Sequence, residues 1–188
     1  MSTSTNLADP APLGLSAFGL TTLILSLANA GIVPEAGAAV IGMALFFGGL
    51  TQAAAGMWEF ARGNTFGATA FSSFGAFWLA FWWLQTNPEV AQKAGAAGVG
   101  TFLVVWLVLT ALLTVAAAKT NGATLTVFVL LTLTFAALTI GDFTTLVGFT
   151  RVGGWLGIAT AAAALYTAWA GVTNATWKRD VLPVWPRG

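Results

Sequence analysis

The chain has 188 residues, of which 57% are hydrophobic and only 7% are charged, and its mean hydropathy is +0.84. Soluble domains carry about 25% charged residues, so this chain has too little charge to cover a water-facing surface, and its composition indicates an integral membrane protein. Its net charge of +1 argues against a nucleic-acid partner, because binding nucleic acid needs a clustered basic face.

The chain contains neither cysteine nor histidine. Without cysteine, disulfides, thiolate catalysis and cysteine-based metal sites are excluded. Without histidine, the commonest general base and the commonest metal ligand are missing. We therefore predict that the protein is not an enzyme and that it has no cofactor and no metal site.

The first long apolar run is entered through the motif Asp9-Pro10-Ala11-Pro12-Leu13-Gly14-Leu15. Two prolines one residue apart hold φ near about −65° and remove two backbone donors, so a helix cannot run through them from upstream. Asp9 can accept hydrogen bonds from the N–H groups of the next turn. Gly14 and Gly19 leave the helix surface bare, which lets another backbone come close. By itself this pattern is typical of a proline-stiffened start to a membrane helix.

Six apolar runs follow one another along the chain. Each is close to the 20 or so residues that are needed to cross a hydrocarbon core of about 30 Å. They cover approximately residues 14–31, 36–57, 66–85, 96–118, 123–140 and 152–172, and Gly, Pro, Asn and charged residues punctuate the breaks. We therefore predict an all-α membrane protein with six transmembrane helices within residues 14–172, an N-terminal tail of residues 1–13 and a C-terminal tail of residues 173–188.

Lysine and arginine in the short loops predict the orientation in the membrane. If the N-terminus is cytoplasmic, the inside segments hold Arg62, Lys119, Lys178, Arg179 and Arg187, and the outside segments hold Lys93 and Arg151. The excess of five over two favours both termini inside. Tryptophans near the predicted helix ends suit the aromatic belt at the membrane interface: Trp58, Trp82, Trp83, Trp177 and Trp185.

A short pattern recurs near the start of the first, third and fifth runs. Its copies are residues 14–18, 67–71 and 124–128, which end in Phe18, Phe71 and Phe128. The recurrence would fit three helical hairpins around a common axis lined by the odd-numbered helices, although such short similarities also arise by chance in helices rich in Ala and Gly. Small residues four apart, Gly153 with Gly157 and Ala44 with Gly48, favour ordinary close helix packing over a subunit interface.

No charged residue lies in the middle of a predicted helix, which disfavours a pump with a carboxylate at mid-depth. The polar side chains at depth are hydroxyls and amides: Thr21, Thr22, Ser26, Asn29, Gln52, Ser72, Ser73, Thr132 and Thr134. Most of the hydroxyls are expected to bond their own helix carbonyls. The amides of Asn29 and Gln52 need partners from a neighbouring helix or from a solute. A pathway of this kind would suit a small solute with one polar end, with the rings of Phe18 and Phe74 blocking hydrated ions.

The motif Asp9–Leu15 resembles the Asn-Pro-Ala-Pro-Leu-Gly-Leu signature of the acetate uptake transporter family, which comprises the bacterial succinate–acetate permeases and their fungal acetate/ammonium relatives. Six of the seven positions match, and Asp9 stands where the family usually has Asn. An ionised Asp can only accept hydrogen bonds, so a contact in which that Asn donates would be lost here. Further stretches similar to family motifs lie at residues 48–52, 58–67, 73–78 and 135–142.

The resemblance implies a six-helix subunit with a solute pore inside it, assembled into a ring of six. It also implies an apolar constriction at Phe18, Phe74 and Leu131, with Thr22 and Gln52 as polar neighbours. Phe74 stands where many members have Tyr, so a ring hydroxyl contact is missing. Ala28 stands where bacterial members often have His before the Asn, so a protonatable site beside the pore is also missing.

Our hypothesis is therefore the uptake of acetate, and of similar small carboxylates such as succinate, across a prokaryotic cytoplasmic membrane. The mechanism is either proton-coupled symport or channel-like passage, with Phe18, Thr21, Thr22, Asn29, Gln52, Phe74 and Leu131 as candidate pathway residues. Glu59 and Asp142, near helix ends, are candidates for proton coupling. A channel for ammonia, urea or a short amide is the alternative, because a pore without fixed charge would suit these solutes equally well. A non-transporting membrane scaffold is a third hypothesis.

Overall fold

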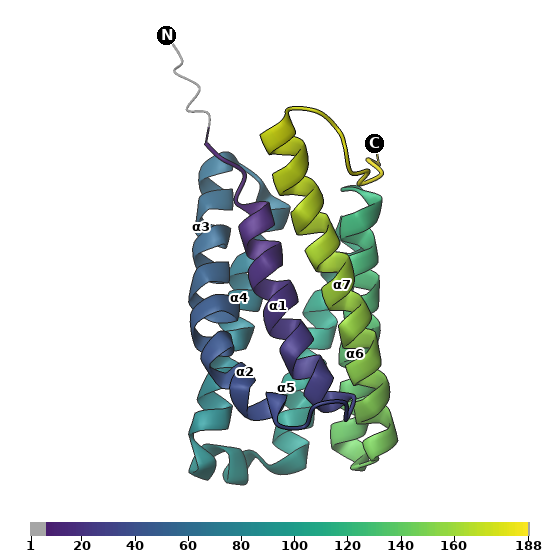
Figure 1. Cartoon of the computed structure of the whole chain (residues 1–188). Helices are drawn as coiled ribbons and strands as arrows, with labels where there is room; N and C mark the ends of the chain where they lie inside the picture. The colour runs from purple at the N-terminus through teal and green to yellow at the C-terminus, as the bar shows by residue number, and fades with distance from the viewer. Residues whose placement is uncertain (1–6, 188) are drawn as a thin grey trace.

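The computed structural model describes residues 7–187, and the regular elements in that range are helices. They are α1 (Ala11–Asn29), α2 (Ala36–Leu45), the π-helix η1 (Phe46–Thr51), α3 (Gln52–Arg62), α4 (Thr65–Thr86), α5 (Pro88–Ala117), α6 (Gly122–Thr144) and α7 (Val147–Trp177). Figure 1 shows the long helices side by side along one axis. Residues 1–6 of the predicted N-terminal tail and residue 188 of the C-terminal tail lie outside the described residues.

The structure confirms the prediction of six membrane-spanning segments. The elements α2, η1 and α3 follow one another without a break and form a single span, Ala36–Arg62. In the described part of the chain, this span, α1, α5, α6 and α7 are five segments that are both long enough and apolar enough to cross a membrane. The sixth is α4, whose 22 residues are long enough, but several Thr, Ser and Gln side chains lower its hydropathy.

The first helix begins at Ala11, three residues before the predicted start at Gly14. Pro12 lies in its first turn, where the missing backbone N–H would have no partner within the helix anyway. The first helical hydrogen bond runs from the Gly14 N–H to the Pro10 carbonyl, at 3.0 Å. The double-proline motif therefore forms the entry turn of α1 rather than a linker in front of it.

Helix α5 is interrupted at Gly95, which has φ 56° and ψ −172°. A positive φ combined with an extended ψ is favourable only for glycine. The segment from Pro88 to this break lies across the lower end of the bundle in Figure 1. The break comes one residue before Ala96, where the fourth apolar run is predicted to begin.

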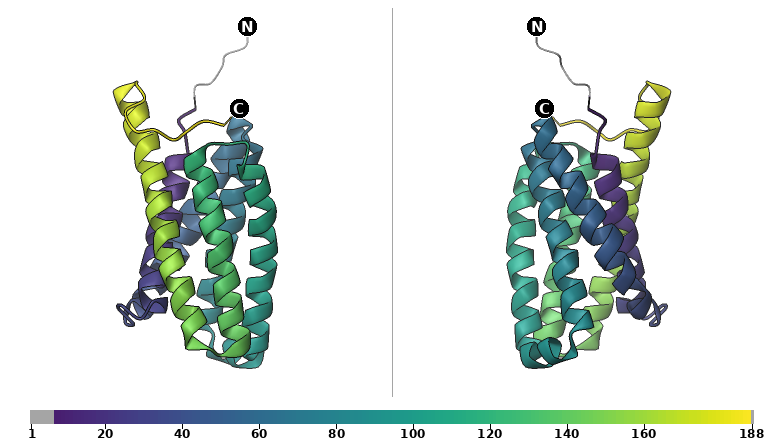
Figure 2. Two further views of the ribbon diagram at one scale, coloured as in Figure 1. Left: turned by 90° about the vertical axis from the view of Figure 1, so that its right-hand side faces the viewer. Right: turned by 90° about the vertical axis from the view of Figure 1, so that its left-hand side faces the viewer.

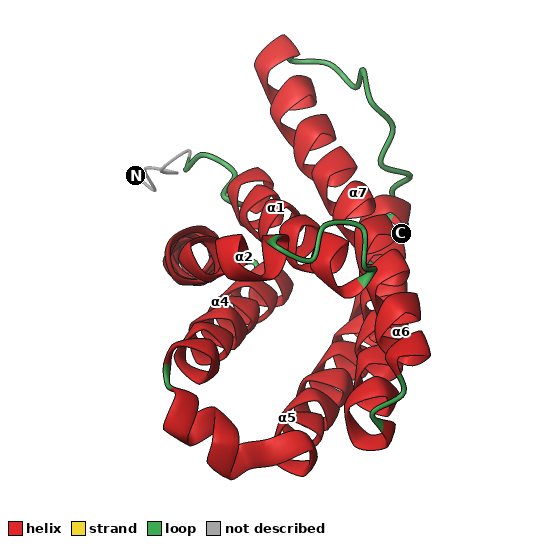
Figure 3. Ribbon diagram, turned by 60° about the horizontal axis from the view of Figure 1, so that its bottom comes forward, coloured by secondary structure: helices red, strands yellow, loops and turns green. Residues whose placement is uncertain are grey.

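The helices form a ring when seen along the axis, as Figure 3 shows. Going round it, α1 packs on α7, α7 on α6, and α6 on α5, while α4 contacts both α5 and the span that ends in α3. The two side views in Figure 2 show that all six spans keep roughly the same direction. The six spans thus form the predicted helix bundle.

Glycines permit the closest helix crossings in the subunit. A Cβ on Gly154 would lie 2.2 Å from the backbone nitrogen of Ala30, and one on Gly157 would lie 2.2 Å from the Ser26 hydroxyl oxygen. These contacts join α7 to α1. Gly48 likewise faces Trp78 and Thr21. The small-residue patterns therefore serve packing within the subunit, as the sequence favoured.

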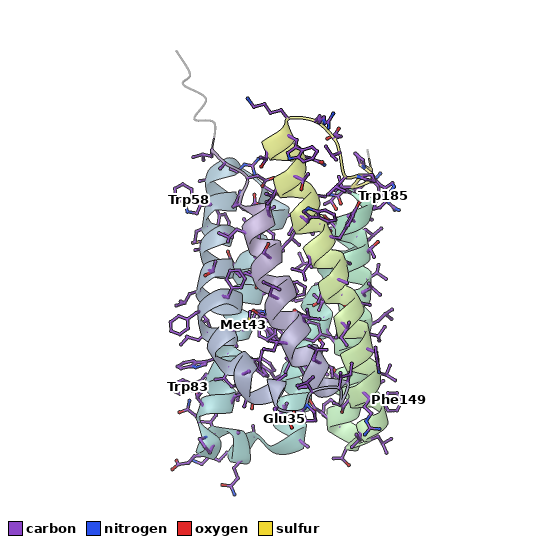
Figure 4. All side chains as sticks on the ribbon, in the orientation of Figure 1. Glu35, Met43, Trp58, Trp83, Phe149 and Trp185 are labelled. Carbon is purple, nitrogen blue, oxygen red and sulfur yellow. The ribbon has the colours of Figure 1, made fainter. Side chains whose placement is uncertain are left out.

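Tryptophan side chains lie near both ends of the bundle. Figure 4 shows Trp58 and Trp185 near the end where the chain enters and leaves, and Trp83 near the opposite end. All three are more than half exposed. Wide indole rings with one N–H suit the boundary between lipid and water, so the positions of these rings agree with the predicted aromatic belts.

The C-terminal segment 178–187 folds back onto the bundle. Helix α7 runs to Trp177, five residues beyond the predicted end, and Lys178 then turns the chain with φ 53°. The Asn174 side chain bonds the backbone of Val181 and Leu182 at 2.8–2.9 Å. The Trp185 carbonyl accepts from the Gly122 N–H at 2.7 Å, so this segment satisfies a free donor at the start of α6.

Candidate solute pathway

A cavity of about 440 Å³ opens at the end of the bundle that carries the termini, and we call it the terminal vestibule. The signature motif, the α3–α4 turn and the start of α6 surround it. Its polar lining consists of Asp9, Glu59, Arg62, Asn64, Thr120, Asn121 and Thr124.

Glu59 is fully buried beside this vestibule, near the end of α3. Its Oε2 accepts a hydrogen bond from the Asn64 Nδ2 at 2.9 Å, and Oε1 has no partner among the described residues. The same Asn64 caps α4, because its Oδ1 accepts from the Gly67 N–H at 3.1 Å. Gly67 leaves room for the Glu59 carboxyl group, since a Cβ there would lie 2.8 Å from its carboxyl carbon and the side chain would have to shift.

Asp9 and Arg62 form an ion pair at the mouth of the terminal vestibule. Asp9 Oδ1 also accepts from the Ala11 N–H at 3.1 Å, as the sequence led us to expect. In both contacts Asp9 acts as an acceptor, so neither of them requires the amide donor that an Asn would bring. The ion pair fastens the signature motif to the end of α3.

We expect the variant Asp9→Asn to keep its fold, with a change in the free energy of unfolding below about 1 kcal/mol. Arg62 and Asp9 are 33% and 49% exposed, so solvent weakens their attraction, and an Asn oxygen can still accept from Ala11. Thermal unfolding in detergent at low and high salt measures the effect. A loss of stability several times larger at both salt concentrations would contradict this expectation.

The middle of the bundle holds a cavity of only about 20 Å³, which we call the central cavity. Such a space accommodates about one water molecule. Its lining comes from α1, α4 and α6, with one residue from α3, and consists of Leu15, Phe18, Gln52, Ala70, Phe71, Phe74, Val127, Phe128 and Leu131. Gln52 supplies the only side chain with hydrogen-bonding groups in this set.

Aromatic rings close the central cavity. The ring centroid of Phe74 lies 5.8 Å from that of Phe18 and 6.2 Å from that of Phe128. On its other side Phe74 stacks on Phe135 at 6.5 Å, and Phe135 belongs to the lining of the next cavity. A solute can therefore pass only if these side chains rotate.

The π-helix η1 places Gln52 in this apolar surrounding. Gln52 follows η1 directly and is 1% exposed, and its Oε1 has no partner among the described residues. Gly48 within η1 lets Trp78 and Thr21 pack against the backbone. Single turns of π-helix are frequent at functional sites, and here one precedes the only amide of the central cavity.

A third cavity, of about 340 Å³, lies on the far side of the Phe74 ring, and we call it the far vestibule. It is lined mainly by apolar residues of α1, α4, α5 and α6. Its polar lining residues are Asn29, Gln85, Asp142 and Thr150. The two acidic candidates, Glu59 and Asp142, thus line two different cavities, the terminal vestibule and the far vestibule.

The structure brings together most of the predicted pathway residues. Phe18, Gln52, Phe74 and Leu131 line the central cavity, and Asn29 lines the far vestibule. Of the described residues, Thr21 and Thr22 line none of these three cavities. The Thr21 hydroxyl donates to the Ala17 carbonyl of its own helix at 2.8 Å, whereas the buried Thr22 hydroxyl has no partner in the described part of the chain.

Phe71 and Phe128 were not among the residues predicted to line the pathway. Both line the central cavity, and both end a copy of the short pattern that Phe18 ends in the first helix. Each also lies three residues before another lining residue on the same helix face, Phe74 or Leu131. The recurrence was therefore the available signal for these two rings.

The sequence profile of the GPR1/FUN34/yaaH family matches residues 1–186. The chain belongs to this family. The match covers all six spans, and the resemblance drawn from the signature motif is thereby confirmed.

Relatives of this family member occur in bacteria and fungi. The succinate-acetate/proton symporter SatP of Escherichia coli K12 is 38% identical over 183 residues, which are 96% of this chain and 97% of that protein. The ammonia transport outward protein 2 of Saccharomyces cerevisiae is 44% identical over 178 residues, which are 89% of this chain. The chain spans between 62% and 66% of the length of the fungal relatives that match it at 43–46% identity.

The structure of this chain is also similar to a solved structure of the bacterial acetate channel SatP. The two share 38% sequence identity and a TM-score of 0.89, over 95% of this chain and 99% of that chain. The agreement extends to the whole six-helix bundle.

Proposed function

We propose that this protein carries acetate, and similar small carboxylates such as succinate, across a membrane through a pathway inside each subunit. The observation that carries the proposal is the central cavity, together with two vestibules that each have an acidic residue and other polar residues in their lining. The central cavity is a constriction of Phe18, Phe74 and Leu131 with one buried amide and no charged side chain. The names of the bacterial relatives, a succinate-acetate/proton symporter and an acetate channel, support the same solute class.

The chemistry of the central cavity suits a short carboxylic acid. The aromatic rings and Leu131 can contact a methyl group, and they leave no room for a hydrated ion. The Gln52 amide can donate to a carboxylate oxygen, and it can accept from the hydroxyl of the protonated acid. The neutral acid therefore crosses with the smaller cost of desolvation, because burying an unpaired charge is very unfavourable.

We further propose that Glu59 exchanges protons with the solute in the terminal vestibule. Its carboxyl group is buried, borders the vestibule and leaves one oxygen without a partner among residues 7–187. Asp142 lines the far vestibule, where acetate arrives from outside, and its carboxylic acid can give acetate a proton. When the resulting acetic acid reaches the terminal vestibule, the Glu59 carboxylate accepts that proton, and acetate and the Glu59 carboxylic acid result. Glu59 then releases the proton to water in the terminal vestibule.

Uptake of radiolabelled acetate into proteoliposomes, with and without an inward proton gradient, tests the proposal. Accumulation above the outside concentration, beyond the acid diffusion seen in protein-free vesicles, would indicate coupled transport. Faster equilibration without accumulation would indicate a channel. Equal behaviour of vesicles with and without the protein would refute carboxylate transport.

The variant Glu59→Gln tests the proton-exchange role. A Gln oxygen can still accept from Asn64, so we expect the fold and the equilibration of acetate without a gradient to persist. Accumulation driven by the gradient should fall at least about tenfold, because an amide cannot carry the proton. The matched control is Glu35→Gln, whose carboxylate is exposed in the α1–α2 turn. Unchanged accumulation in Glu59→Gln would remove this residue from the mechanism.

The assembly and the orientation are also proposals. The outer surface carries many exposed apolar side chains, among them Val105, Leu112 and Val115 of α5, which suits contact with lipid or with other subunits. With the resemblance to the family, this supports a homohexamer in the cytoplasmic membrane with both termini in the cytoplasm. Native mass spectrometry and labelling of single cysteines from outside the cell test the two statements.

Ammonia is the alternative solute, and two observations favour it as the second candidate. The central cavity has no fixed charge, and one relative is named an ammonia transport outward protein. Competition separates the two solutes. We expect other short acids to inhibit acetate uptake, and ammonium or urea to have no effect; the opposite pattern would favour ammonia.

A further inference from the structure

Helix α6 contributes Phe128 and Leu131 to the central cavity, and two pairs of threonines bind this helix to its neighbours. On one side, the hydroxyl oxygens of Thr114 in α5 and Thr132 in α6 lie 2.8 Å apart. On the other side, those of Thr134 in α6 and Thr160 in α7 lie 3.2 Å apart. Neither Thr132 nor Thr134 lines the cavities described above.

The two pairs flank the face of α6 that lines the pathway. Successive residues of an α-helix are separated by about 100° around its axis. Thr132 is therefore about 100° to one side of Leu131, and Thr134 is about 60° to the other side. Hydrogen bonds on both sides of a helix resist its rotation about its own axis, and that rotation decides how far Leu131 and Phe128 reach into the central cavity.

The Thr114–Thr132 pair also reaches the backbone of a residue that lines the cavity. The Phe128 carbonyl oxygen lies 3.1 Å from the Thr114 hydroxyl and 2.8 Å from the Thr132 hydroxyl. Each hydroxyl has one proton. The Thr114 hydroxyl also lies 2.8 Å from the Thr110 carbonyl of its own helix, and within the pair either hydroxyl can donate to the other. A hydrogen bond therefore crosses from α5 to α6 beside Phe128.

From this geometry we infer that Thr114 and Thr132 are positioning residues for selectivity. They keep α6 at one angle about its own axis. That angle places Leu131 and Phe128, and these two side chains determine which solutes fit the central cavity. The Thr134–Thr160 pair, which joins α6 to α7, keeps α6 at the same angle. The selectivity part of this inference rests on the proposed carboxylate transport, whereas the rotational part does not.

The isosteric variants Thr114→Val and Thr132→Val remove the hydrogen bond and keep the side-chain shape. The chain has no cysteine, so Leu131→Cys provides a single reporter for a water-soluble thiol reagent. We expect each Val variant to change the labelling rate of this reporter about threefold, the scale of one interhelical hydrogen bond in a membrane. The variant Thr132→Ser keeps the hydroxyl, so its labelling rate should equal that of the protein with Thr132 intact.

The matched control is Thr110→Val. Thr110 is buried one turn away on α5, and its hydroxyl bonds only the Trp106 carbonyl of its own helix among the described residues. This variant should leave the labelling rate unchanged. An unchanged rate in both Thr114→Val and Thr132→Val, or an equal change in Thr110→Val, would overturn the inference whatever the solute is.

Flux measured with Leu131 intact tests the selectivity part. The ratio of butyrate to acetate uptake should change about threefold in Thr114→Val and Thr132→Val, and Thr132→Ser and Thr110→Val should keep the original ratio. An altered labelling rate with an unchanged ratio would overturn the assignment to selectivity. Absence of any acetate flux in the unmodified protein would instead refute the proposed function, and the labelling result would still decide the rotational part.

Discussion

The variant Leu131→Ala is expected to admit larger acids than the unmodified protein, with an increase of about tenfold or more in the ratio of butyrate to acetate uptake. Leu131 is 4% exposed and lines a central cavity of about 20 Å³. Alanine removes three carbon atoms from its wall, and one methylene in an apolar pocket already changes discrimination by about 10- to 200-fold.

Proteoliposomes that contain labelled acetate, propionate or butyrate measure this ratio. The matched control is Leu133→Ala, because Leu133 lies on the same helix but is 49% exposed on its outer side. The control should keep the ratio of the unmodified protein. An unchanged ratio in Leu131→Ala, with the protein folded and active on acetate, would contradict the assignment of Leu131 to the constriction.

The variant Gly154→Ala should lose about 3 kcal/mol of stability, which is a large effect for one methyl group. The added Cβ would lie 2.2 Å from the Ala30 nitrogen and 2.6 Å from the Asn29 carbonyl carbon. These are backbone atoms at the end of α1, so the clash is relieved only if α1 and α7 separate. Asn29 borders the far vestibule, and acetate flux should therefore fall as well.

The thermal midpoint and the monodisperse yield in detergent measure this loss. Gly148→Ala is the matched control, since Gly148 is also in α7 and a Cβ there would have no atom within 4 Å. Alanine is the better helix former by up to about 1 kcal/mol, so the control should be as stable as the unmodified protein or slightly more so. Equal midpoints for the two variants would show that α1 and α7 do not pack as closely as the structure places them.

The polar residues show where sequence reasoning reached its limit. Gln52 was predicted to need a partner outside its own helix, and the structure leaves its Oε1 buried without one among the described residues. Thr132 was grouped with the same candidates, and its hydroxyl lies 2.8 Å both from the Phe128 carbonyl of its own helix, as predicted for most hydroxyls, and from the Thr114 hydroxyl of the neighbouring helix. A hydroxyl can donate its hydrogen bond to a carbonyl of its own helix or to a group on a neighbouring helix, and the residue type does not say which. An amide has more groups to satisfy and was the more reliable indicator.

The buried Glu59 was identified as a candidate only by its place near a helix end. Its enclosure depends on Asn64 and Gly67, which belong to the next helix and fold back over it through the α3–α4 turn. The fold of segment 178–187 onto α6 was not predicted either, because its bonds to Gly122 and Asn174 join residues that are far apart in the sequence or lie beyond the predicted helix end.

The sequence by itself determined the class of protein, the six spans, the entry through the double-proline motif and the membership of the family. These follow from local properties: the length of apolar runs, the backbone limits of proline and glycine, and short motifs. Only the tertiary structure decided which face of each helix lines the pathway. The spans are apolar on nearly all sides, and lipid and helix neighbours are equally apolar, so the hydrophobic pattern carries little information about rotation. Close contacts at glycines and a few hydrogen bonds between helices set that rotation, and with it the packing of Phe18, Phe74 and Leu131 around the central cavity.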